Sequence, residues 1–321
     1  MRTLRLLFLT LVVVLIGAVV GGIAIVIQPV KVIASQPPQV DPKRLEAHVK
    51  HLTVDLYPRS YDQLHNIDLA AQYIFNELEA AGGRVTVQDV YAPGAPYKNI
   101  VARFGPPSGP VVVIGAHYDT HGDTPGADDN ASGIAGLLEL ARLLGRTTQA
   151  RPIELVAYAL EEPPYFRTEH MGSAWHARSL RAANQEVAFM LSLEMIGFFS
   201  DEPGSQNYPV PAMSLLYSDR GDFIALVGKL SDFGPMRRIK ALMTGATNLP
   251  VYSLNAPPRL QGVDYSDHLN YWHEGFPAFM VTDTAFFRNK NYHLASDTYE
   301  TLDYGRMAKV VQAVYAVAQQ Y

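Results

Sequence analysis

The sequence predicts an α/β protein with helices on both faces of a mixed, mostly parallel sheet, and one further helix at the N-terminus. Three observations lead to this fold class. β-rich runs alternate with helical patterns along the 321 residues, after two successive β-rich runs that favour an opening hairpin. The composition is that of a globular chain, with 48% hydrophobic and 18% charged residues. The third observation is a long uncharged run near the N-terminus.

The uncharged run begins at Leu6 and ends at Ile27, so it contains 22 residues. A helix of that length extends about 33 Å, which is enough to cross a hydrocarbon core of about 30 Å. Arg2 and Arg5 precede the run and only Lys31 follows it closely, so we expect the N-terminus in the cytoplasm. The rest of the chain would then lie on the periplasmic or extracellular side. Secretion after cleavage of a signal peptide is the alternative, although the apolar region of such a peptide is usually about 7–15 residues.

The chain is expected to have three parts. Residues 1–35 form the membrane anchor with its flank, and residues 36–40 form a short linker because Gln36 is followed by Pro37 and Pro38. Residues 41–321 form one folded domain. We expect no contacts across the linker, so the anchor should project from the domain and be dispensable for its chemistry.

Apolar periodicity and turn residues place the elements of the domain in order. Glycines at 82 and 83 end a helix whose apolar positions begin at Ile67. Loops rich in Pro, Gly, Asn and Ser at 200–211 and 244–262 are too long for simple connections, so we expect them to shape a substrate rim. The other expected helices are 41–51, 132–144, 173–183, 222–233 and 304–319, and the expected strands are 84–91, 99–104, 111–116, 153–160, 188–193, 213–217 and 278–282.

Imidazoles and carboxylates follow four of the predicted strands. His117 comes after the most apolar strand, Glu161 and Glu162 after the next, and Glu194 and His293 after two later ones. In an open α/β sheet, ligands bind beyond the carboxyl ends of the strands. Each group alone is weak evidence for a metal site, because such residues usually serve as helix caps or solvated loop ends. Their coincidence at one edge, together with Asp-Asp-Asn at 128–130, favours a metal site.

Composition also excludes several classes of function. The chain has no cysteine, so disulfides, thiolate metal ligands and a cysteine nucleophile are all excluded. The net charge is −5 and the sequence contains no basic block, which argues against nucleic acid as a partner.

Five polar motifs follow one another along the chain: His117-x-Asp119, Gly126-Ala127-Asp128-Asp129-Asn130-Ala131-Ser132-Gly133, Glu161-Glu162, Leu193-Glu194-Met195-Ile196-Gly197, and Tyr292-His293 with Ser296-Asp297-Thr298. This ordered set resembles the clan MH co-catalytic zinc aminopeptidases. The resemblance covers about residues 41–321 and implies a phosphorylase/hydrolase-like, three-layer α/β/α fold that removes N-terminal residues from peptides with a free N-terminus.

The resemblance implies two Zn²⁺ ions, although other divalent metals suit the same ligands. His117 and Glu194 would bind one ion, Glu162 and His293 the other, and Asp129 would bridge both. The bond after Asp129 would be a cis peptide.

The resemblance also implies roles for residues around the ions. Glu161 would act as the general base toward a metal-activated water. Asp119 would hydrogen-bond the His117 imidazole. Tyr292 would either stabilise the oxyanion or pack against the metal loop.

Two departures from the family pattern bear on selectivity and geometry. Residues 163–170 form an insert after the Glu-Glu pair, and Glu194 occupies a position where Asp is the commoner ligand. The segment around Asp267 and His268 resembles one that lines the family's cleft, and we assign it no ligand role. Of the remaining histidines, His121 and His170 are nearest in sequence to the expected site.

Related reactions stay open at this point. Glutaminyl cyclases resemble the family but use one zinc, whereas the presence of both His117 and Glu194 favours two ions and hydrolysis. A carboxypeptidase of the same fold is a further alternative, because the direction of exopeptidase action is set by charges in the pocket. Receptor ectodomains that have lost ligands share the fold, but this sequence lacks none of the expected ligands.

Overall fold

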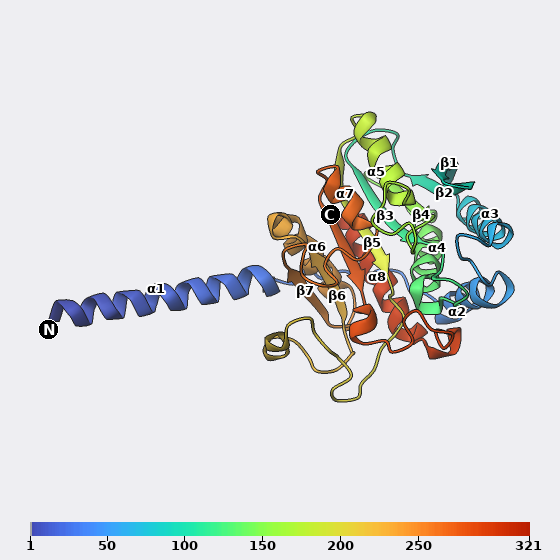
Figure 1. The fold of residues 1–321 in the computed structure, drawn as a ribbon. Coiled ribbons are helices and arrows are strands. Elements are labelled where there is room, and N and C mark those ends of the chain that lie inside the picture. The colour runs from blue at the N-terminus through green and yellow to red at the C-terminus, as the bar shows by residue number, and fades with distance from the viewer. Residues whose placement is uncertain (1) are drawn as a thin grey trace.

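The computed structural model describes residues 2–321, and Figure 1 shows one long helix projecting from a compact domain. This helix is α1 (Arg2–Ile27). Its stretch Leu9–Ile27 has a mean hydropathy of 2.9, and none of the described side chains in it is buried. The projection expected from the uncharged run is therefore present. By length and composition α1 could cross a membrane or serve as a signal sequence.

A single mixed sheet forms the middle of the domain, and within residues 2–321 it contains eight strands in the order β1-β2-β4-β3-β5-β8-β6-β7. The pairs β3–β4, β3–β5, β5–β8 and β6–β7 are parallel, while β1–β2, β2–β4 and β6–β8 are antiparallel. The expected opening hairpin is β1–β2. The strands are β1 (Arg84–Ala92), β2 (Ala95–Phe104), β3 (Val111–His117), β4 (Ile153–Tyr158), β5 (Val187–Glu194), β6 (Ile224–Gly228), β7 (Val251–Asn255) and β8 (Ala278–Thr282).

Helices cover both faces of this sheet, which confirms the predicted three layers. Val112 and Ile114 of β3 belong to a large buried cluster with α2, α3, α4, α6 and α8. Val111 and Val113 face the other way and pack with α5 and α7. Since both faces are covered, β3 is apolar at almost every position. The helices are α2 (Pro42–Lys50), α3 (Leu64–Ala80), α4 (Gly133–Leu144), α5 (Gly172–Ala182), α6 (Phe233–Ala246), α7 (His268–His273) and α8 (Tyr304–Gln320).

Two predicted elements are wrong. The strand expected at 213–217 is a 3₁₀ turn, Pro211–Leu215, which begins with a proline that suits the first turn of a helix. The helix expected at 222–233 is instead strand β6, followed by the short turn Leu230–Asp232. A five-residue apolar run fits a buried strand as well as a helix, and here the sheet decides. Helix α6 and strand β7 were not predicted, so the loop expected at 244–262 is partly regular structure.

The flank between α1 and residue 36 lies against the domain, whereas the sequence analysis expected no contacts between the anchor region and the domain. Ile33 N–H donates to the carbonyl of Ala241, and Ser35 N–H donates to that of Gly245, both at 3.1 Å. The flank therefore runs alongside α6, and its backbone hydrogen bonds belong to the fold.

Candidate metal centre

The polar side chains singled out in the sequence meet at the carboxyl ends of the central strands. His117 is the last residue of β3 and Glu194 is the last residue of β5. Glu161 and Glu162 follow β4, which ends at Tyr158. Asp129 reaches the same place from the turn Ala127–Ser132, directly before α4.

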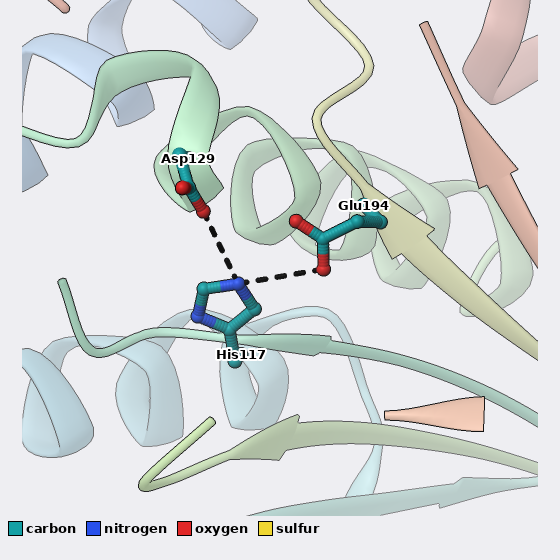
Figure 2. A group of neighbouring side chains, drawn as sticks. All are labelled: His117, Asp129 and Glu194. Atoms are coloured by element: carbon teal, nitrogen blue, oxygen red, sulfur yellow. Dashed lines mark ion pairs between the residues drawn. The ribbon is translucent and has the colours of Figure 1, made fainter. Parts of the chain in front are cut away.

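His117, Asp129 and Glu194 form the first of two donor groups, which we name the first triad (Figure 2). His117 Nε2 lies 3.4 Å from Asp129 Oδ1 and 3.5 Å from Glu194 Oε2. All three residues are buried. One oxygen of Asp129 is thereby directed at His117, and its other oxygen is free for a second partner.

Asp129, Glu162 and His293 form the second triad. His293 Nε2 lies 3.1 Å from Asp129 Oδ2 and 3.3 Å from Glu162 Oε2. Asp129 therefore gives one carboxylate oxygen to each triad, which is the arrangement a bridging ligand needs. The five side chains that the sequence analysis grouped around two ions lie together in this structure.

The spacing and chemistry of the donors fit metal ions of the size of zinc. Two ligands about 2.0–2.2 Å from zinc at a tetrahedral angle are about 3.3–3.6 Å apart, which matches the separations in the first triad. Such distances are long for hydrogen bonds. Accordingly, buried His117 Nε2 and Glu162 Oε1 have no hydrogen-bond partner among the described residues. Buried polar atoms without partners are costly, and a cation would satisfy both.

The charge of the cluster also favours a cation. Burial raises the pKa of the Glu162 carboxyl to about 8, and Asp129 beside it adds to the shift. Burial would lower the pKa of His293, but its hydrogen bonds to Asp129 and Glu162 raise it to about 10. Burial also raises the pKa of Glu161 and of Glu194. Three buried glutamates with raised pKa values thus lie close together, and positive charge would relieve the repulsion between their carboxylates.

Glu161 lies beside both triads without being a member of either. Its Oε2 is 3.9 Å from His117 Nε2. Asp119 holds the backbone of Glu161 and Glu162 in place. Its carboxylate accepts hydrogen bonds from the backbone N–H groups of Glu161 at 3.1 Å and of Glu162 at 3.0 Å. The expected bond from Asp119 to the imidazole is weaker than these, since Oδ1 lies 3.5 Å from His117 Nδ1. The carbonyl oxygen of Asp119 is nearer to that nitrogen, at 3.2 Å.

The backbone at the centre has an unusual conformation. Leu160 (φ 63°), Met195 (φ 52°) and His293 (φ 58°) are in the left-handed region, which residues other than glycine rarely adopt. Leu160 directly precedes Glu161, Met195 directly follows Glu194, and His293 is itself a member of the second triad. Such strain persists where surrounding structure imposes it, commonly at functional sites. The Asp129–Asn130 peptide bond is cis, as the family resemblance implied.

Residues outside the predicted set hold the donors in place. The Asp297 carboxylate accepts the N–H groups of Asp128 and Asp129, at 3.0 and 3.1 Å. Ser266 Oγ donates to Glu194 Oε2 at 2.7 Å. The fully buried Arg59 guanidinium donates to the carbonyl groups of Tyr118 and Gly126, which anchors the loop before Asp129. These contacts join segments far apart in sequence. The motif with Asp297 and the segment around Asp267, which includes Ser266, were noted in the sequence, but Arg59 gave no signal there.

Comparison with known proteins identifies the family. The family described as Peptidase family M28 matches residues 99–318, about two thirds of the chain. The chain belongs to peptidase family M28. It is therefore a hydrolase of peptide bonds.

Two curated proteins illustrate the range of M28 relatives. The protein named Uncharacterized protein YfbL from Escherichia coli (strain K12) is 52% identical over 89% of this chain and 90% of its own length. A probable leucine aminopeptidase from Trichophyton verrucosum is 28% identical over 65% of this chain. The chain spans 53% of that fungal protein, about half its length.

Solved structures share the M28 fold seen here. LapB from Legionella pneumophila has a TM-score of 0.70 and 25% identity, over 87% of this chain and 71% of that chain. A glutaminyl cyclase from Bacteroides thetaiotaomicron has a TM-score of 0.68 and 20% identity, over 89% of this chain and all of that chain. The second likeness concerns the fold alone.

In this M28 peptidase, the His293 imidazole is stacked between two other rings. Tyr292 lies on one side with ring centroids 3.8 Å apart, and His121 on the other at 4.0 Å. His121 is thus the additional histidine that touches the centre. His170 is elsewhere, with Nδ1 3.0 Å from the carbonyl oxygen of Tyr91.

An apolar pocket adjoins the centre of this M28 peptidase, and Glu194 and Tyr292 belong to its wall. Residues 206–209 and 261–262 also line it, so both predicted rim loops contribute. The insert 163–170 supports the same wall, because Arg167 pairs with Asp264 and lies over the ring of Tyr265, at 4.9 Å from its centroid. Apolar and aromatic side chains make up most of the wall, among them Met213, Tyr217, Phe223, Val227, Tyr252, Leu254, Met280, Phe286 and Phe287.

Proposed function

We propose that this M28 peptidase is an aminopeptidase that uses two zinc ions, one in each triad. The observation that supports this most strongly is the pair of triads that share Asp129, with Glu161 left free beside them. A site for a single ion would need only one of the two imidazoles. It would also need no carboxylate that directs one oxygen toward each triad. Mixed nitrogen and oxygen donors of this kind are typical of zinc.

Zinc, when bound, would supply positive charge that polarises the scissile carbonyl and acidifies water. Glu161 then acts as the general base, taking a proton on a carboxylate oxygen and passing it to the leaving amine. Asp119 holds the Glu161 backbone so that this carboxylate stays beside the triads. Tyr292 is partly buried, and burial raises the pKa of its phenol, so the hydroxyl keeps its proton and can donate to the oxyanion.

The surroundings favour a free N-terminus over a C-terminal carboxylate as the group recognised. The buried carboxylates around the triads make the site attractive to an α-ammonium group. Among the described residues that line the adjoining pocket, none is Lys or Arg, so that pocket offers a carboxylate no cationic partner. We infer that the pocket receives the side chain of the N-terminal residue, and that its wall selects apolar or aromatic side chains.

We further propose that α1 is an uncleaved membrane anchor. The exposed stretch Leu9–Ile27 is long enough to span a bilayer. Basic residues precede it at Arg2 and Arg5, and this bias supports a catalytic domain on the periplasmic or extracellular side.

One panel of substrates tests the proposed reaction. The full chain in detergent is loaded with zinc and incubated with leucyl and phenylalanyl anilides, an N-acetylated anilide, an N-acetylated peptide with a free C-terminus and an N-terminal glutaminyl peptide. We expect hydrolysis of the two free-amine anilides and none of the acetylated one, with Glu161→Gln as the inactive control. Cyclisation of the glutaminyl peptide with release of ammonia, without anilide hydrolysis, would instead indicate a glutaminyl cyclase. Release of a C-terminal residue from the acetylated peptide would indicate a carboxypeptidase.

A further inference from the structure

The C-terminal end of α1 is fixed directly to the domain. The carbonyl oxygen of Ile27 accepts from Lys240 Nζ at 2.6 Å and from Ser253 Oγ at 2.9 Å. Gln28, which is buried, donates from its side-chain amide to the carbonyl of Phe233 at 3.2 Å. The helix therefore has no flexible tether at this end, and the domain surface begins where the apolar stretch stops.

Exposed apolar side chains lie around this junction on two segments, and we name Leu215, Leu216, Leu230 and Phe233 the foot patch. Leu215 is 85% exposed and Phe233 49% exposed. Phe233 is the residue whose carbonyl binds Gln28. Leu216 precedes Tyr217, whose hydroxyl donates at 2.7 Å to the carbonyl of Ser253, the residue bonded to Ile27. Figure 1 shows α1 leaving the domain on this side, next to α6 and β7.

We propose that the foot patch inserts into the lipid interface around α1, so that the domain rests on the membrane in one orientation. This inference depends on the proposed membrane anchor. If the apolar stretch ends at Ile27 within a bilayer, the groups bonded to the Ile27 carbonyl lie at headgroup level. The patch lies beside those groups, where large apolar side chains gain by leaving water.

The charge next to the patch suits the same partner. Helix α6, which starts at Phe233, continues with Arg237, Arg238 and Lys240. The Arg237 side chain is exposed, and basic residues near a bilayer are attracted to anionic headgroups. Phe233 with these residues gives the apolar and basic combination that is typical of interfacial segments. A lipid interface therefore matches the patch better than a second protein surface.

The natural absence of cysteine makes a direct test possible. Single variants Leu215→Cys and Leu230→Cys of the full chain are labelled with an environment-sensitive fluorophore and placed in nanodiscs containing anionic lipid. Leu69→Cys, at an exposed position on α3, is the matched control, and Leu15→Cys reports on α1 itself. Quenching by lipids that carry a spin label on the acyl chain is measured for each.

We expect quenching and a blue-shifted emission for labels at 15, 215 and 230, and neither for the label at 69. Quenching at 15 without quenching at 215 and 230 would overturn the inference and leave the anchor intact. A blue shift at 215 without quenching would mean that protein covers the patch, which also overturns it. No quenching at 15 would disprove the anchor and the seating together, while the anilide assay still reports the enzyme's reaction separately. Quenching of the label at 69 as well would show that the domain does not rest on the membrane in one orientation, which also overturns the inference.

Discussion

The two triads share Asp129 but are built differently. In the first triad, His117 and Glu194 are the terminal residues of neighbouring strands, and the His117 side chain is completely buried. In the second triad, His293 comes from a loop, is 23% exposed, and is held between the rings of His121 and Tyr292. One triad is thus positioned by the sheet and the other by side-chain stacking, so we expect the first to hold its ion more tightly.

The largest effect is expected where the two triads join. Asp129→Ser removes an oxygen from each triad, so both ions should be lost together, and anilide hydrolysis with them. Metal content by mass spectrometry and activity are measured on the same sample. His293→Ala is the comparison, because it should remove the second ion first. If Asp129→Ser kept one ion at full occupancy, the carboxylate would not bridge.

Glu161 and Glu162 are adjacent in sequence but are assigned different roles. Glu161→Gln should lower kcat by about 10²–10⁴-fold, because the general base is lost, while both ions stay bound. Glu162→Gln should instead weaken the second ion. Titration of the metal-free variants with zinc separates the two outcomes. Equal loss of metal in both variants would show that Glu161 is a ligand.

Stacking on His293 should affect the second triad alone. His121→Ala removes one of the two rings, and such supporting contacts usually contribute about 10–100-fold to metal affinity. We expect weaker binding of the second ion and an unchanged first ion, measured by competition with a chelator. His170→Ala is the matched control, since His170 contacts Tyr91 and neither triad. An equal effect on both ions would remove the distinction between the triads.

Without metal, the stability of the protein should fall as the pH rises. The pKa of Glu162 is raised from 4.5 to about 8 and that of His293 from 6.5 to about 10, so the native state keeps protons that the unfolded chain releases. When the native state binds more protons, the free energy of unfolding decreases with pH. The Tm of chelator-treated protein should therefore be lower at pH 8 than at pH 5. Zinc should remove most of this difference, and a Tm that rises with pH would contradict the assignment.

The smallest effect is expected far from both triads, at the flank. A chain that begins at Gln28 keeps the hydrogen bonds of Ile33 and Ser35 to α6, whereas one that begins at Val40 loses them. Loss of about 1 kcal/mol lowers the Tm of a domain of this size by about 2–4 °C. Both chains should bind two ions with the same kcat on anilides. A shorter chain that lost metal would show that the flank supports the centre.

The sequence predicted the central part of the fold well, because the parallel strands at 111–116 and 278–282 are buried on both faces. It failed at 222–233, where an apolar run fits either a strand or a helix, and pairing with β8 decides for the strand. The five proposed ligands were placed together by strand-end reasoning and family resemblance. The supporting hydrogen bonds of Arg59 and Ser266 were not predicted, because their partners lie far away in sequence and come close only in the folded chain.

The position of the donors along the chain has a consequence for biosynthesis. The first triad is complete at residue 194, whereas the second needs residue 293, which is synthesised 99 residues later. A nascent chain therefore presents one full set of proposed ligands well before the other. Long-range pairing is also slow, so β8 and the loop after it are among the last parts to join the sheet. Acquisition of metal should thus be ordered in time, with the second ion entering only as the domain closes.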